Sequence, residues 1–534
     1  MKKILFVGIA FVSTLSFAQK STISDINMKG FSGVKVIKES KEVYFSYFDQ
    51  KTENKGMANY VLYILDADLK QKTKSVFEVN KNADLVANSF NGKEYLFSFR
   101  DLWKKTIMHV VLDGAGKQVG LHTVEKVKMS LDNPITHGLS NGDFVIIQPI
   151  KEDKVGYRLD VFDHKMVSKL SKTYTPEKGA YECKSSKVLN DKLYLMREVD
   201  ASFSNKFYTE IVCYDLKTGE IVYNNPLNDE TSTGYATFFN VEPDGKLVTG
   251  GMYFKGQKFD DKNSDGIFSL IIDPTGKVLS KQKTPWAAIK DKIKSDQSLG
   301  ALINGKSKVL IEDMVYNQDG SFSIIGENFR KSSAGMTGNL GMALAMGSGS
   351  SSSAVGFTIE DLCLFDYSAS GQLLNIRKVG KEAQEFEIND LSNPGKDYYK
   401  GLQLAMILKR GKLFPYQFQV EYNGEKTLVF FGEEGTKKMA YFMSSSAINT
   451  SNLPKIDLQL EDIKVGEGLN NALSALQSVT GNKSTVNIEY GSVKDYAGNS
   501  KGVLHFYADK IVMYKMYYAD KMLKIDLWQN SMPK

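Results

Sequence analysis

The stretch Phe268–Leu279 reads F-S-L-I-I-D-P-T-G-K-V-L, and it decides the fold class because its pattern recurs along the chain. A mostly apolar run ends at Asp273, turn residues follow, and a second strand-like run begins at Val278. Asp and Gly supply side-chain-to-backbone hydrogen bonds and positive φ at such places, which hairpin turns require. The stretch therefore predicts two antiparallel strands joined by a tight turn.

Six copies of this pattern indicate a repeat architecture. Apolar runs end at Asp66, Asp113, Asp163, Asp215, Asp273 and Asp366, with spacings of 47, 50, 52, 58 and 93 residues. A second series of turns, out of phase with the first, starts at Asn91, Asn141, Asn190, Pro243 and Gln318, and each turn precedes another strand-like run. A period of about 50 residues with four antiparallel strands is typical of a β-propeller blade.

We therefore predict an all-β fold, a β-propeller of four-stranded antiparallel blades with short helical inserts. Seven blades are favoured and eight are the alternative. Six recognisable blades occupy residues 19–380, and one or two divergent blades in residues 381–534 close the ring. Closure is expected through a strand around Val34–Ile37 that pairs with the last blade and removes the open edges.

Two segments break the strand pattern and predict helices. Thr284 and Pro285 resemble an N-cap and first helical residue, and Trp286, Ile289 and Ile293 then share one helical face. Residues 469–476 form a second amphipathic candidate. An outer-membrane barrel and a pair of β-sandwiches are the competing folds, but a barrel needs stricter alternation than the apolar third strands have.

The N-terminus predicts export. Lys2 and Lys3 precede an apolar run from Ile4 to Leu15, and the small residues Ser16 and Ala18 form a cleavage site. Residues 1–18 are therefore assigned as a signal peptide. The apolar run is shorter than the roughly 20 residues of a membrane helix, and no second candidate follows. We expect a protein without a transmembrane segment after processing that is periplasmic, outer-membrane-associated or secreted.

Composition and motifs exclude several classes of function. The net charge is +6, and the charges of both signs are interspersed, which is not the pattern of a nucleic-acid-binding protein. None of the five histidines has zinc-ligand spacing, and nucleophile-elbow and phosphate-loop motifs are missing from the sequence. Three cysteines, at positions 183, 213 and 363, allow one disulfide at most, and Cys213 and Cys363 lie in apolar runs that predict burial. No catalytic residue is assigned, and no cofactor is expected apart from calcium.

The candidate metal site is the loop D-D-K-N-S-D-G at residues 260–266. Asp261, Asn263, Asp265 and Gly266 match the first half of a calcium loop, D-x-N-x-D-G. The position that should carry a closing Glu holds Ile272 instead. Calcium held by Asp261, Asn263 and Asp265 is therefore one reading, and a polar turn between the second and third strands is the other.

A second loop on the same expected rim is unusual in length. The segment Gly335–Gly356 adds about 20 residues of Gly, Ser and Met between the second and third strands of its blade. It reads as a mobile Gly/Ser loop or as a partner-contact loop with adaptable methionines. Since loops joining second to third strands share one face of a propeller, that loop-bearing rim is the expected working surface.

The leader ending S-F-A-Q and repeats of the F-S-L-I-I-D-P-T-G-K-V-L type resemble uncharacterised exported β-propeller-like proteins of Bacteroidota-type bacteria. This resemblance implies a propeller in the cell envelope and no established activity. We expect a monomeric, non-catalytic binding or scaffold protein that recognises a protein or a glycan through its loop-bearing face. A propeller enzyme, a hydrolase or lyase acting on glycans or peptides, is the alternative.

Overall fold

A computed structural model confirms the all-β propeller. It describes residues 19–26, 32–37, 40–49, 56–125, 133–151, 154–200, 207–256, 264–296, 307–333, 355–380, 383–388, 409, 414–422, 424–434, 437–447, 452–457, 500–507, 510–519 and 522–532. Within these ranges the chain forms 33 strands and one helix. None of the helical structure described is long and apolar enough to cross a bilayer.

The first four units of four strands follow one another along the chain. Their strands are β2(Lys35–Ile37), β3(Glu42–Asp49), β4(Met57–Leu65), β5(Gln71–Asn80); β6(Ala83–Phe90), β7(Tyr95–Asp101), β8(Thr106–Leu112), β9(Gln118–Val124); β10(Ile135–Gly138), β11(Phe144–Lys151), β12(Val155–Phe162), β13(Ser168–Tyr174); β14(Ala180–Leu189), β15(Lys192–Asp200), β16(Phe207–Asp215) and β17(Ile221–Pro226).

The remaining strands and the helix complete the ring. They are β18(Ser232–Val241), β19(Leu247–Lys255), β20(Gly266–Ile272), β21(Val278–Pro285); α1(Trp286–Ser295); β22(Ser307–Tyr316), β23(Phe322–Ser333), β24(Val355–Tyr367), β25(Leu373–Val379), β26(Gln384–Ile388); β27(Tyr416–Tyr422), β28(Glu425–Glu434), β29(Lys437–Ser444), β30(Lys455–Asp457); β31(Ser500–Tyr507), β32(Lys510–Ala519), β33(Met522–Ser531) and the N-terminal β1(Gln19–Ile26).

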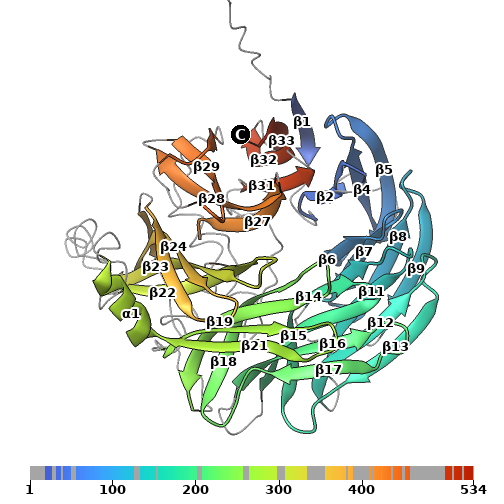
Figure 1. The fold of residues 1–534 in the computed structure, drawn as a ribbon. Coiled ribbons are helices and arrows are strands. Elements are labelled where there is room, and N and C mark those ends of the chain that lie inside the picture. Colours follow the sequence, from blue (N-terminus) through green and yellow to red (C-terminus); the bar gives the residue numbers. More distant parts are fainter. Residues whose placement is uncertain are drawn as a thin grey trace, which may run out of the picture.

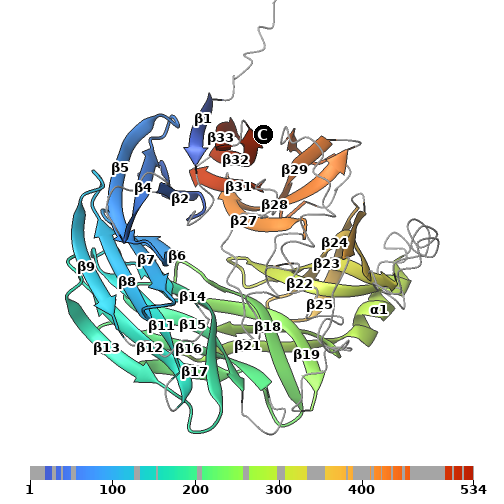
Figure 2. The ribbon, with the colours of Figure 1, turned by 180° about the vertical axis from the view of Figure 1, so that it is seen from behind.

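These strands form seven hydrogen-bonded sheets, six of which hold one four-stranded unit each. The seventh, an eight-stranded sheet, joins the units β10–β13 and β14–β17 through a single parallel bridge between Val155 and Ala180. The described strands therefore form seven hydrogen-bonded sheets, which equals the favoured number of blades. Counted as four-stranded units they number eight, which equals the alternative number of blades. The units are arranged around a common centre (Figures 1 and 2).

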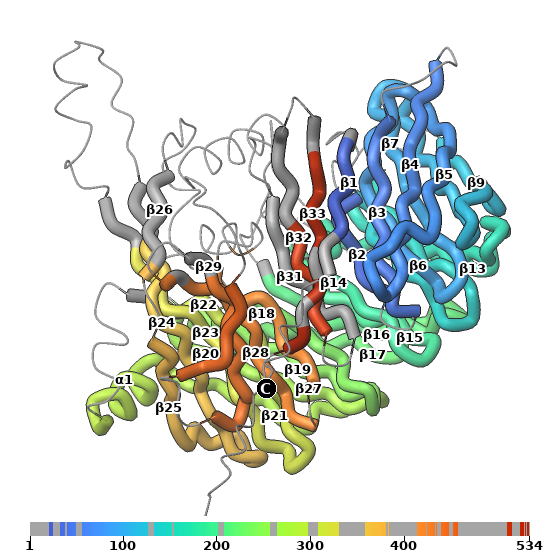
Figure 3. Tube along the Cα trace, turned by 90° about the horizontal axis from the view of Figure 1, so that it is seen from above, coloured from blue at the N-terminus to red at the C-terminus, as the bar shows by residue number. Residues whose placement is uncertain are grey.

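Within each unit the first strand is innermost and the last is outermost. Outer strands such as β5, β9 and β13 alternate between exposed and partly buried residues, as expected for a strand with one face in solvent. The second and third strands, such as β7 and β20, are almost completely buried. The tube view separates the first units from the later ones around the ring (Figure 3).

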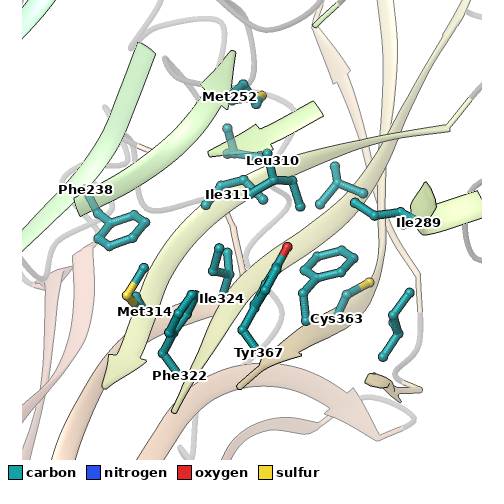
Figure 4. Packing of buried hydrophobic residues seen from close by; sticks show 14 of the residues in the cluster. Phe238, Met252, Ile289, Leu310, Ile311, Met314, Phe322, Ile324, Cys363 and Tyr367 are labelled. Atoms are coloured by element: carbon teal, nitrogen blue, oxygen red, sulfur yellow. The ribbon is translucent and has the colours of Figure 1, made fainter. Parts of the chain in front are cut away.

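The core is divided into eight buried apolar clusters among the described residues, and each lies between two neighbouring units. The largest joins the units β18–β21 and β22–β25: Phe238 and Met252 meet Leu310, Ile324 and neighbouring side chains (Figure 4). Another cluster joins the first unit to the last and so closes the ring. A blade has two buried faces because it packs against a neighbour on each side.

Ring closure differs from the sequence prediction. The strand that pairs with the last unit is Gln19–Ile26, whereas Lys35–Ile37 pairs with β3 as the inner strand of the first unit. The described register runs from Gln19 opposite Gln529 to Ile26 opposite Leu523. The prediction was wrong because β1 is polar at most positions: Ile23 is its buried contact to the core, which leaves little apolar signal.

The Asp-led turns form as predicted in five of the six copies. Asp273, for example, accepts hydrogen bonds through Oδ1 from the backbone N–H groups of Thr275 (2.8 Å) and Lys277 (2.9 Å). The sixth copy is different, because Asp366 lies within β24 and pairs with Arg377. Ser368, two residues further on, forms the turn there by accepting the N–H of Gln372.

The helix predicted after Thr284 is α1, and Ile289 and Ile293 are its buried residues. Its N-cap is Pro285 rather than Thr284, because Thr284 still pairs with Ile267 in the sheet. The second helical candidate, at residues 469–476, lies outside the described residues.

Candidate functional site on the inner wall

The inner wall of the ring consists of the first strand of each unit, and β14 is its longest described member without a buried residue. All ten residues of β14 are partly exposed, in contrast to the buried strands β15 and β16 behind it. The strand still contacts the core, because Tyr181, Cys183 and Val188 pack against a buried apolar cluster. This wall has two ends, which we name by the connections around them.

The loop face carries the connections from second to third strands and from one unit to the next. The turn face carries the connections from first to second strands and from third to fourth strands. Contacts between the two kinds of connection confirm the loop face. Lys104, after β7, donates to Asn80 at the end of β5 (2.8 Å), and the N–H of Trp286, after β21, donates to the carbonyl of Asp265, before β20 (3.0 Å). At these two places the two kinds of connection lie side by side, whereas most of the loop at residues 260–266 and of the insertion Gly335–Gly356 lies outside the described residues.

At the loop-face end of β14, two carboxylates share one lysine. Glu182 and Glu198 are directly opposite each other on β14 and β15, and their carboxylates lie 3.0 Å and 2.7 Å from the Nζ of Lys184. A β-bulge between Cys183 and Ser185 inserts Lys184 as an extra residue, which brings it between the two acids. The carboxylate of Glu182 is the most accessible of the three, with 35% of its side chain exposed.

Aromatic side chains lie on the other face of the same strands, because Tyr181 and Arg197 alternate with Glu182 and Glu198 along β14 and β15. The guanidinium of Arg197 lies 3.7 Å from the ring centre of Tyr181 and is held from behind by Glu210, with 2.7 Å between Nη2 and Oε2. The hydroxyls of Tyr157 and Tyr214 accept from the other side of that guanidinium. Burial, followed by the charge of Glu210, raises the pKa of the partly exposed Tyr208, which therefore stays a neutral hydroxyl.

At the turn-face end, polar side chains from several units are linked across the wall. Lys187 of β14 donates to Asn240 of β18 (2.7 Å), Asn240 donates to Asp313 of β22 (2.5 Å), and the hydroxyl of Tyr416 of β27 donates to the same carboxylate (2.6 Å). We call Lys187, Asn240, Asp313 and Tyr416 the wall network. Because each member belongs to a different unit, the network forms only when the ring is assembled.

A second link at this end joins residues 184 positions apart. Lys426, at the start of β28, lies 2.9 Å from the carboxylate of Glu242, which follows β18. Burial lowers the pKa of Lys187, while Asp313 and Glu242 counter that effect and Lys426 adds to it. Opposite charges thus balance one another at the turn-face end. These charged residues hold the units together and do not form an open site for an anion or a cation.

The predicted calcium ligands are only partly within the structure. Asp261 and Asn263 lie outside the described residues. The carboxylate of Asp265 accepts from the N–H of Lys255 (2.6 Å), and its backbone N–H donates to Tyr253 (2.8 Å), so Asp265 brackets the loop at its base. No group of three metal-binding side chains occurs in the part of the chain that the structure describes. Calcium at this loop stays a prediction.

The insertion Gly335–Gly356 lies almost entirely outside the described residues, but its base is defined. The β23–β24 hairpin stays paired as far as Ser333 opposite Val355, and β26 pairs with the same end of β24. A pocket of about 490 Å³ lies beside α1, lined by residues that include Lys283, Lys292 and Leu373. The base of the insertion belongs to the loop face, whereas the pocket extends from α1 to the start of β25.

Sequence reasoning missed the acid pair and the wall network. Glu182, Lys184 and Glu198 lie in plain strand sequence, and the members of the wall network are spread over 230 residues of chain. The histidines follow the default expectation: His109 is buried and hydrogen-bonded to Ser98 (2.8 Å), and burial lowers its pKa to about 3. Cys213 and Cys363 are buried, as their apolar surroundings predicted.

Comparisons with known proteins give a family and a set of similar folds. A family of unknown function (DUF6770) matches residues 1–438. The chain is similar to the β-propeller domain of the Trilobed protease from Pyrococcus furiosus, which has an open velcro topology: identity is 11%, coverage is 79% of this chain and 98% of that chain, and the TM-score is 0.32. It is also similar to the Dos1 propeller, with 9% identity, 95% and 94% coverage and a TM-score of 0.40. A protein from Lactobacillus plantarum matches with 11% identity, 82% and 96% coverage and a TM-score of 0.36. No curated protein matches the chain in sequence.

Proposed function

We propose that this chain, which belongs to the family of unknown function DUF6770, is an exported, non-catalytic binding protein of the cell envelope that holds a glycan at the loop face of its ring. The observation that carries this proposal is the acid pair, Glu182 and Glu198, with Lys184 between them on the accessible strand β14. Charged donors and acceptors fixed in one place suit the hydroxyl groups of a sugar, which both donate and accept hydrogen bonds.

The strands that carry the acid pair are held from the opposite face of the sheet. The Arg197–Glu210 ion pair and the hydroxyls of Tyr157 and Tyr214 lie on that face. The acid pair is therefore held in place before a ligand arrives, which lowers the entropic cost of binding.

Charge pairing favours binding over acid–base catalysis. Lys184 lies within 3.0 Å of both carboxylates of the acid pair. A hydrolase needs two carboxyl groups that can exchange protons with a substrate, and here Lys184 occupies the space between the two. The described carboxylates at the other end of the wall, Glu242 and Asp313, have basic or hydroxyl partners too.

Export is proposed from the leader at residues 1–18, which lie outside the described residues. In support, the closing strand β1 starts at Gln19, the residue that cleavage after Ala18 would leave first. The mature N-terminus would then enter the ring directly at Gln529. Sequencing the N-terminus of the protein recovered from the cell envelope tests this part, and an intact Met1 would contradict it.

The binding proposal is tested with the mature protein on a glycan array, followed by titration of the best glycan. Glu182→Gln removes one charge of the acid pair and should weaken binding by about tenfold, since a hydrogen bond to a charged group contributes roughly 1.5–3 kcal/mol. Glu220→Gln is the matched control, because Glu220 is exposed beyond the outer edge of the same unit. Equal loss in both variants, or binding to peptides alone, would contradict the proposal.

The acid pair also favours one alternative, a glycan hydrolase or lyase. Two carboxylates held near the same Nζ become a general acid and base if a bound substrate displaces Lys184. Incubating the array glycans with the mature protein and measuring new reducing ends or unsaturated products separates the two functions. Turnover that disappears in Glu198→Gln would replace the binding proposal by the enzyme.

A further inference from the structure

The β7–β8 turn presents the most exposed large apolar side chain reported for the described residues. Trp103 has 85% of its surface exposed, and its neighbour Leu102 has 42%. An indole in water loses the favourable free energy of burial, so a fully exposed Trp on a protein of this size requires an explanation. The remaining residues of the turn, Lys104 and Lys105, are exposed as well.

The turn is rigid, so the exposure of Trp103 does not come from a loose loop. Asp101 is 1% exposed, and its Oδ1 accepts from the backbone N–H groups of Trp103 (3.0 Å) and Lys104 (2.9 Å). Lys105 takes a left-handed conformation with φ of 54°, and Asp101 pairs with Thr106 across the base of the hairpin. The backbone thus holds Trp103 at the tip of a defined turn before any partner arrives, which lowers the entropic cost of binding.

Positive charge surrounds the exposed apolar tip. Lys104 is held by an uncharged partner, the side-chain oxygen of Asn80 (2.8 Å), so its charge is not neutralised there. Lys81, next to Asn80 on the neighbouring connection, is exposed. Of the acids at the base of the hairpin, Asp101 is buried with its Oδ1 bonded to backbone N–H groups, and Asp84 lies opposite Arg100. Lys81, Lys104 and Lys105 therefore form a cationic border around Leu102 and Trp103.

We propose that the Leu102–Lys105 turn docks the loop face on an anionic lipid bilayer. Trp is enriched at the interface between headgroups and acyl chains, because its ring is apolar and its N–H is polar. Each lysine close to an anionic surface adds about 1 kcal/mol of attraction. Leu102 favours a bilayer over a sugar as the ligand. An exposed aliphatic side chain gains favourable free energy when it leaves water for a bilayer, whereas a sugar buries little of its apolar surface.

The inference goes beyond glycan binding and does not depend on it. Glu182 lies on the inner wall, whereas the turn joins two middle strands of another unit. A propeller docked through this turn would present its loop face to the membrane surface. Any partner of that face would then be held close to the bilayer.

The test is flotation of the full mature protein with vesicles of phosphatidylglycerol and phosphatidylcholine, compared with vesicles of phosphatidylcholine alone. The wild type should float with the anionic vesicles and be released as salt is raised, because screening shortens the range of the lysine charges. Trp103→Ala should weaken the partition by roughly tenfold, as expected from returning an indole to water. Lys104→Glu combined with Lys105→Glu should abolish the preference for anionic lipid.

Leu121→Ala is the matched control, because Leu121 is 50% exposed on the outer strand of the same unit. It should float like the wild type, and unchanged melting temperatures of all variants would exclude unfolding as the cause. No flotation of the wild type, equal binding to neutral vesicles, or full binding by Trp103→Ala would overturn the proposal. So would a shift of tryptophan fluorescence, absent in Trp103→Ala, that occurs with soluble oligosaccharides and not with vesicles. Glu182→Gln should float normally, which separates this test from that of the glycan.

Discussion

His109 shows how a single buried side chain makes the fold sensitive to acid. His109 lies on β8 and is 1% exposed, and its Nδ1 forms a hydrogen bond with the hydroxyl of Ser98. Burial, with smaller contributions from the charges of His122 and Arg158, lowers its pKa to about 3, against about 6.5 in the unfolded chain. The stability it contributes is therefore complete above pH 6.5 and is lost as the pH falls through that window towards 3.

We predict that His109→Asn flattens this part of the stability profile. Urea unfolding between pH 7 and pH 4 should show the wild type losing stability more steeply than the variant, although the variant is less stable at pH 7. His164→Asn is the control, since His164 is exposed in the turn after β12. Parallel profiles for wild type and His109→Asn would contradict the expectation.

Two glycines in matching backbone conformations test how closely the outer turns pack. Gly276 has φ of 94°, and a Cβ added there would lie 2.5 Å from the Cβ of Tyr223 on the neighbouring unit. Gly142 has φ of 92°, and an added Cβ would meet nothing within 4 Å. Gly142→Ala should lose about 1 kcal/mol from the positive φ alone. Gly276→Ala should lose a further 1–3 kcal/mol from overpacking, as measured by urea midpoints, and equal losses would contradict this explanation.

At the scale of the element, the closing strand β1 holds the ring together through its ladder with β33 and one buried contact at Ile23. Ile23 is 6% exposed and packs in the cluster with Ile525 and Leu527, and the hydroxyl of Thr22 donates to Asp526 (2.7 Å). Without β1, the last unit would have three strands and β33 would be left as an open edge. This short strand therefore supports the closure of the whole ring.

Ile23→Ala should lower the free energy of unfolding by about 2–4 kcal/mol, because it removes buried apolar volume from the closing contact. Ile221→Ala makes the same chemical change on another outermost strand, where the side chain is 45% exposed, and should cost less than about 1 kcal/mol. Thermal unfolding monitored by circular dichroism compares the two. A similar loss in both would mean that β1 does not support the ring.

At the scale of the molecule, pairs that join distant units hold the ring at its inner wall. Glu242 and Lys426 belong to units separated by one other unit, and their side chains are 16% and 26% exposed. Partial burial reduces screening, so this ion pair should contribute more than a surface pair does.

A double-mutant cycle with Glu242→Gln and Lys426→Gln should give a coupling energy of about 1 kcal/mol. The Lys172–Glu220 pair joins two adjacent units but is 38% and 74% exposed, and its coupling should be close to zero. Urea unfolding of the four variants of each cycle provides the measurement. Equal couplings would mean that burial of the wall pair adds nothing.

The local turn chemistry explains why so much of the fold could be predicted. Asp113, Asp163 and Asp273 form the turns expected of them, because an Asp side chain bonds to backbone two and four residues ahead, whatever the distant structure. Asp366 matches the same sequence pattern but does not form the turn, because its carboxylate forms an ion pair with Arg377 within the sheet. The closing strand was misplaced for a related reason: its partner is about 500 residues away and its own pattern is mostly polar.

The sequence by itself determined the repeat, its four strands, the turns and the helix at Trp286, since all of these depend on neighbours within a few residues. Only the tertiary structure decided which strand closes the ring, which carboxylates meet at Lys184 and which charges link across the wall. It also showed that Trp103 is exposed rather than buried. Burial and long-range pairing depend on how units stack around the centre, and the spacing of residues along one chain does not record that arrangement.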